Sequence, residues 1–309
     1  MPANLTTKAR FQGALDTLLE EVKEDRQILA AILCGSLAYD VVWDKSDIDL
    51  VFISADDKKV RSHSLALVVD DINIHAQVVP RAEFRRELES SFHNSSRHSV
   101  YARGSLVYSR DPSIDALVQQ IKNLGERDLK TQVLNSSQFA LVLLYKARKW
   151  YEVKDDIAYT TTWLLGTASA IADIEISLHG ELVDRDCLPR ALPLNPTLFG
   201  LIYSDLISKP VTRAMIEKGL VAVDEYLESK ADSLFSPVLE YLQEAGGEPR
   251  SMTQIEHYFR RNYGVEGLAL ACEWLSDIGA IEKASTDLAL TPLSRVRVQE
   301  LAFFYARPS

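Results

Sequence analysis

The stretch Ile32–Ile53 reads ILCGSLAYDVVWDKSDIDLVFI, and the rest of the chain is organised around it. A first apolar run ends at Gly35, and Asp47-Ile48-Asp49 opens a second one. Side chains alternate between the two faces of a strand, so Asp47 and Asp49 are expected on one face and Ile48 on the other. Two neighbouring carboxylates repel each other, and a divalent cation between them relieves this repulsion. The pair therefore predicts a Mg²⁺ site, because Mg²⁺ is held by one or two carboxylates together with substrate phosphates.

Gly35 and Ser36 follow the first apolar run directly. At this point we expect a strand to turn into a short helix over residues 37–42. Free backbone N–H groups and the positive end of a helix dipole attract anions. Gly35 and Ser36 are therefore predicted to hold the terminal phosphates of a nucleoside triphosphate.

This arrangement resembles the nucleotidyltransferases of the polymerase-beta-like superfamily, in which Gly-Ser is followed, after a similar spacer, by Asp-x-Asp between apolar residues. The resemblance looks closest to small bacterial members such as the aminoglycoside and lincosamide nucleotidyltransferases. It implies Mg²⁺-dependent transfer of a nucleoside monophosphate, AMP from ATP, to a hydroxyl of a small molecule or protein, with release of pyrophosphate. It implies Asp47 and Asp49 as catalytic metal ligands and Gly35 and Ser36 as nucleotide contacts.

The chain departs from the family pattern at the third carboxylate. On the strand expected over residues 72–79, the best match is His75, with Asn73 as the other option. One Mg²⁺ that arrives with the nucleotide is therefore expected rather than two. The role of His75 stays open. It could be a metal ligand, a base for the acceptor hydroxyl, a phosphate contact or simply a hydrogen-bonded residue of a half-exposed strand. Because the missing carboxylate would weaken the metal site, a second function is also considered: the chain could be a regulatory or adaptor protein that binds nucleotide without turning it over.

The expected fold class is α/β (α+β). A mixed nucleotidyltransferase sheet flanked by helices is predicted for residues 1–112, a helical bundle on the acceptor side for 113–234, and a winged-helix-like domain for 235–309. Within the bundle, Lys146 and Lys149 are predicted to bind the nucleotide by neutralising its triphosphate charge.

The last domain is expected to contain a helix over 266–278, two short strands over 280–283 and 288–291, and a final helix over 293–305. The first of these helices carries three acids and neither Lys nor Arg. Reading DNA would need basic residues there, so we expect a protein partner or a homodimer contact instead of nucleic acid.

Several further residues are weaker candidates. Trp43 could stack on a base, but burial in its turn is the preferred interpretation. His93, Arg97, His98 and Arg103 could contact phosphate, although histidines in a polar loop are more often merely solvated.

The composition of the chain limits the classes of function and the cellular location that we expect. The net charge of −10 argues against general binding to nucleic acid or membrane surfaces. The three cysteines are scattered, which favours neither a disulfide framework nor a zinc site. No apolar stretch approaches the roughly 20 residues of a membrane span, and no signal peptide is evident, so a cytoplasmic protein is expected.

Overall fold

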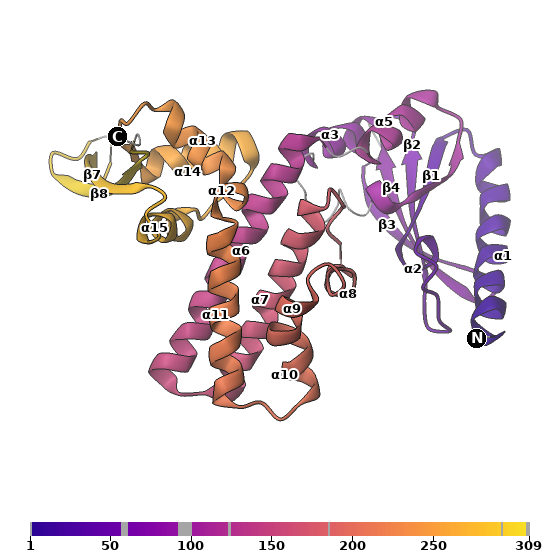
Figure 1. Cartoon of the computed structure of the whole chain (residues 1–309). Coiled ribbons are helices and arrows are strands. Elements are labelled where there is room, and N and C mark those ends of the chain that lie inside the picture. The colour runs from indigo at the N-terminus through magenta and orange to yellow at the C-terminus, as the bar shows by residue number, and fades with distance from the viewer. Residues whose placement is uncertain are drawn as a thin grey trace. The chain divides into compact units, whose positions relative to one another are not determined.

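The computed structural model describes residues 2–56, 61–91, 101–122, 125–184, 186–291 and 293–306. The chain divides into two compact units, Met1–Leu124 and Gly125–Ser309. Each unit is described by itself below (Figure 1). The domain limits predicted at residues 112 and 234 stay predictions.

The first unit is built on a five-stranded mixed sheet with the strand order β3-β4-β2-β1-β5. Strands β2 and β4 are parallel, and the other neighbouring strands pair in antiparallel fashion. The predicted α/β class, with a mixed sheet flanked by helices, is confirmed. The strands are β1 Ile28–Cys34, β2 Ile48–Ser54, β3 His63–Val69, β4 Ile72–Pro80 and β5 Ser105–Ser109, and the helices are α1 Pro2–Glu24, α2 Gly35–Ala38, α3 Arg81–Ser91 and α5 Pro112–Lys122.

Helix α1 covers one face of this sheet, along which it runs in Figure 1. Its buried residues Phe11 and Leu15 share a core with Leu33, Leu50 and Phe52 of the strands. Burial of such apolar side chains contributes about 1.5–3 kcal/mol each. Because strand side chains alternate, this packing directs the other residues of β2 to the opposite face.

The opposite face changes character along β2. Val51 and Ile53 are buried there, whereas Asp49, near the start of the strand, is only half-buried. Helix α3 follows β4 and contacts both β2 and β4. The polar end of this face is therefore the beginning of β2, where the predicted acids lie.

The second unit begins with a helical region. Helices α6 and α7 are joined by a short connection, and the Asp156 side chain caps α7 by accepting a hydrogen bond from the Tyr159 N–H at 2.9 Å. Helix α11 packs on both of them. The helices and turns are α6 Glu126–Lys154, α7 Ile157–Leu178, α8 Cys187–Ala191, α9 Pro196–Phe199, the π-helical turn η1 Gly200–Ser204, α10 Asp205–Ser208, α11 Arg213–Ser229 and α12 Ala231–Leu234.

The C-terminal part of this unit continues the same buried core, to which Phe235, Phe259 and Phe303 contribute. Its three-stranded sheet has the order β6-β8-β7. The elements are α13 Ser236–Glu244, β6 Arg250–Ser251, α14 Met252–Tyr263, α15 Ala269–Asp277, β7 Glu282–Ala289 and β8 Arg297–Phe304.

Two local predictions for this part are wrong. The two short strands expected over 280–283 and 288–291 are replaced by one continuous strand, β7. The helix expected over 293–305 is instead the strand β8, which pairs with β7 on one side and β6 on the other. Strand pairing decides both cases, within the β7–β8 hairpin and between β8 and the distant β6, and the local spacing of apolar residues does not contain it.

In the described part of the chain, no helix combines the length and the apolar character that crossing a bilayer requires.

Candidate functional site

The bend between β1 and α2 is shaped by one glycine. Gly35 has a φ of +67°, in the left-handed region that residues with a Cβ rarely adopt. Cys34, just before it, pairs with Asp49 in the β1–β2 register. A Cβ added to Gly35 would lie 2.0 Å from Oδ2 of Asp49. The Gly-Ser bend and the Asp49 carboxylate are therefore in direct contact, which only glycine permits.

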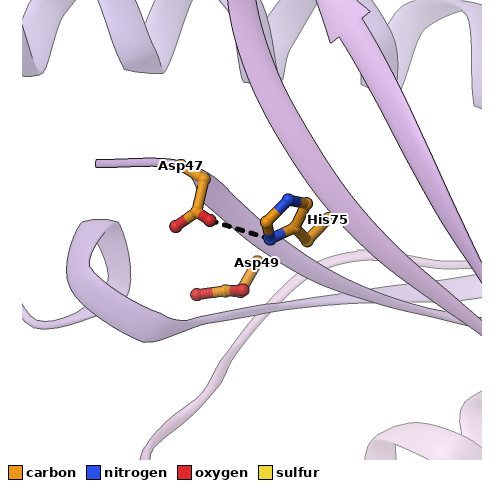
Figure 2. Close-up of side chains that lie close together, drawn as sticks. All are labelled: Asp47, Asp49 and His75. Carbon is orange, nitrogen blue, oxygen red and sulfur yellow. Dashed lines mark ion pairs between the residues drawn. The ribbon is translucent and has the colours of Figure 1, made fainter. Parts of the chain in front are cut away.

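Three side chains converge at the start of β2 (Figure 2). Asp49 and His75 are register partners in the parallel pair β2–β4, so both project from neighbouring strands on the same face. His75 Nδ1 lies 2.7 Å from Oδ2 of Asp47. One ligand atom of each residue, Asp47, Asp49 and His75, lies within 4.8 Å of the other two. The structure thus brings together all three residues that were predicted to be catalytic.

The chemistry of this donor set fits a divalent cation. Two carboxylates supply hard oxygen ligands, and an imidazole supplies a nitrogen ligand. Asp47 is 38% and His75 60% exposed in their side chains, so the cluster is accessible from solvent. Among the residues that the structure describes, this is the one group of at least three acidic, histidine or cysteine side chains arranged closely enough for such an ion.

The neighbouring thiol does not belong to the donor set. Burial, followed by the negative charge of Asp49, raises the pKa of Cys34 to about 12. The thiolate is the form that binds metal, so the neutral Cys34 is a packing residue at neutral pH. The other two cysteines, Cys187 and Cys272, are buried as well.

The turn before β2 carries an exposed indole. Trp43 is 66% exposed, so its predicted burial is wrong. The turn is closed by a hydrogen bond from the Ser46 N–H to the Trp43 carbonyl at 2.9 Å. Thr7 of α1 anchors it by donating to Oδ1 of Asp44 at 2.8 Å. The indole is thus exposed on a turn held by hydrogen bonds, four residues before Asp47. In the sequence, only the polar residues that follow Trp43 indicate that its ring is exposed.

Arg103 lies near the bend that contains Gly35. Its guanidinium carbon is 5.2 Å from the centre of the Tyr39 ring, and Tyr39 directly follows α2. The predicted contact of Arg103 with phosphate stays a prediction. The other weak candidates, His93, Arg97 and His98, lie outside the described residues.

Lys146 and Lys149 are exposed residues of α6 in the second unit. The Lys146 Nζ atom lies 5.6 Å from the centre of the Trp163 ring. Their predicted contacts with a triphosphate stay a prediction.

Comparison with known proteins agrees with this geometry. Residues 15–160 match the family model described as a nucleotidyltransferase domain. This range includes Gly35, Asp49 and His75. The match supports nucleotidyl transfer as the general activity, and with it the use of a nucleoside triphosphate and a divalent metal. A search of curated proteins returned no match.

A solved structure shares the fold over nearly the whole chain. It is a nucleotidyltransferase-like protein from Exiguobacterium sibiricum 255-15, with a TM-score of 0.65 and 16% sequence identity. The alignment covers 96% of this chain and 99% of that chain. At this identity the likeness shows the fold alone, and the resemblance to aminoglycoside and lincosamide enzymes stays a prediction.

Proposed function

We propose that this protein transfers a nucleoside monophosphate, AMP from ATP, to a hydroxyl of a small molecule or protein and releases pyrophosphate. The observation that carries the proposal is the cluster of Asp47, Asp49 and His75 in contact with the glycine bend at Gly35. Their convergence, together with the match to a nucleotidyltransferase domain, favours this activity over a purely regulatory role.

In this proposal Asp47 and Asp49 hold the divalent ion, for which the sequence predicts Mg²⁺. When bound, such an ion offsets the negative charge of the phosphates and aligns them for in-line displacement. The Gly35-Ser36 bend holds the terminal phosphates. The acceptor oxygen forms a bond to the α-phosphorus, the bond to the bridging oxygen breaks, pyrophosphate leaves, and the hydroxyl proton passes to solvent.

Pyrophosphate release tests this function directly. The full-length protein is incubated with ATP, a divalent chloride salt and a panel of hydroxyl acceptors, while isothermal titration calorimetry measures ATP binding. We expect metal-dependent binding together with acceptor-dependent pyrophosphate release. Tight binding without pyrophosphate release across the panel would instead favour the regulatory or adaptor role.

The exposed Trp43 is proposed as a platform for the base of the nucleotide. Stacking of a base on an aromatic side chain contributes about 1–3 kcal/mol, so Trp43→Ala is expected to weaken ATP binding by about five- to 150-fold. Calorimetry provides the affinity. The chain has four tryptophans, so the response of Trp43 is taken as the fluorescence quenching by nucleotide that the parent protein shows and Trp43→Phe lacks.

Trp43→Phe is the matched control for this substitution, because a phenyl ring keeps an aromatic face at the same place. We expect it to retain most of the affinity. An unchanged dissociation constant for Trp43→Ala would contradict base stacking and leave the indole without a role in binding.

The C-terminal elements are proposed to form a winged-helix-like module. Helix α13, strand β6, helices α14 and α15 and the hairpin β7–β8 follow one another in the order of that motif, with β8 central in the sheet. Helix α15 contains acids but neither Lys nor Arg. This composition supports a protein partner or a second copy of the chain, and not nucleic acid.

A further inference from the structure

The third member of the cluster is a nitrogen ligand with a defined direction. His75 presents Nδ1 to the carboxylates, as its 2.7 Å separation from Oδ2 of Asp47 shows (Figure 2). Two such electron-rich atoms approach this closely only when a proton or a cation lies between them. A metal ion held by Asp47 and Asp49 would take the place of that proton and meet Nδ1 as its next ligand.

The backbone holds His75 in this position. The register of β2 and β4 runs without interruption from Ile48–Ile74 to Ser54–Pro80, and Asp49 faces His75 within it. Ile74 and Ala76, on either side of His75, are buried in the core beneath α1. The location of the imidazole is thus fixed by the packed face of the strand, while the ring itself projects to the open face.

Ligand type affects which ion such a site prefers. Mg²⁺ takes oxygen ligands and loses its water reluctantly, whereas imidazole suits first-row transition ions. Mn²⁺ accepts carboxylates as Mg²⁺ does, and as a softer first-row transition ion it binds an imidazole nitrogen more strongly than Mg²⁺ does. We infer that His75 is a metal ligand through Nδ1 and that the cluster binds Mn²⁺ in preference to Mg²⁺. This inference rests on the proposed function, whose metal site it specifies.

The test uses the metal alone with the full-length protein. MnCl₂ is titrated into the protein with MgCl₂ as a competitor, and electron paramagnetic resonance measures the remaining free Mn²⁺. Pulsed measurements on the bound ion then detect coupling to a coordinated imidazole nitrogen. We expect this coupling in the parent protein and its loss in His75→Asp and His75→Gln.

His75→Asp is also expected to weaken the preference for Mn²⁺, because it creates an all-oxygen donor set. Its ratio of Mn²⁺ to Mg²⁺ affinity should fall by about tenfold relative to the parent protein. Comparing the Mn²⁺ to Mg²⁺ affinity ratio of the variant with that of the parent protein cancels any difference in affinity between the two ions that does not depend on His75. His63→Gln is the matched control, since His63 is an exposed histidine of the same sheet whose Nδ1 faces the Arg61 carbonyl at 2.8 Å. It should keep both the ratio and the nitrogen coupling.

Absence of nitrogen coupling in the parent protein, or an unchanged affinity ratio in His75→Asp, would overturn the inference. Either result is distinct from failure of the proposed function. Pyrophosphate release with equal metal preference in the parent protein and His75→Asp would refute the role of His75 and keep nucleotidyl transfer. Nitrogen coupling without pyrophosphate release would support the metal site and refute the transfer reaction.

Discussion

Substituting Asn for Asp47 is expected to lower kcat/KM for nucleotidyl transfer by roughly a thousandfold, which corresponds to about 4 kcal/mol of lost transition-state stabilisation. An amide carries no negative charge, so it binds a divalent cation weakly. The same substitution should weaken metal-dependent ATP binding in calorimetry. Unfolding monitored by circular dichroism should change little, because the partly exposed Asp47 side chain contributes little to packing.

Asp40→Asn is the matched control for this substitution. It removes the same charge from an exposed aspartate of the same segment, one that pairs with Lys8 at 2.7 Å. Asp40 has a φ of 60°, a conformation that Asn adopts with little strain. If Asp40→Asn lost as much activity as Asp47→Asn, the effect would come from net charge. Full activity in Asp47→Asn would remove Asp47 from the metal site.

That Asp47 and Asp49 share one face at the start of β2 could be predicted from sequence, because the two acids belong to one short local pattern. Alternation along β2 separates Asp49 from Ile48, and the structure buries Ile48 while leaving Asp49 half-buried. The neighbourhood of His75 is different. It depends on the register between β2 and β4, which joins segments that are distant in the sequence, so alternation could suggest the face but not the 2.7 Å contact with Asp47.

Each of the errors has a physical cause. Val298, Leu301, Ala302 and Tyr305 recur at helical spacing, yet residues 297–304 form β8. Pairing of this strand with β6 and β7 outweighs that local pattern. Trp43 was expected to be buried because indoles usually are, but the hydrogen bonds that close its turn leave the ring exposed.

Contact between the bend and Asp49 leads to the second large effect. Gly35→Ala is expected to reduce kcat/KM by about a hundredfold, because a shift of roughly 1 Å in a catalytic group has consequences of this size. The new Cβ would lie 2.0 Å from Oδ2, 2.9 Å from Cγ and 3.2 Å from Cβ of Asp49. Such distances force the carboxylate, the bend or both to move. Pyrophosphate release measures the activity, and Mn²⁺ titration should show weaker metal binding.

Backbone strain must be separated from this displacement, since alanine at a φ of +67° costs about 1 kcal/mol by itself. Gly180→Ala provides the comparison. Gly180 has a φ of +75°, and no atom lies within 4 Å of its added Cβ. Both variants should therefore lower the free energy of unfolding through this strain, with an additional loss in Gly35→Ala from the contact with Asp49, while only Gly35→Ala loses activity and metal affinity. Equal activity in the two variants would show that Asp49 accommodates the methyl group, and that glycine at this bend serves the backbone conformation alone.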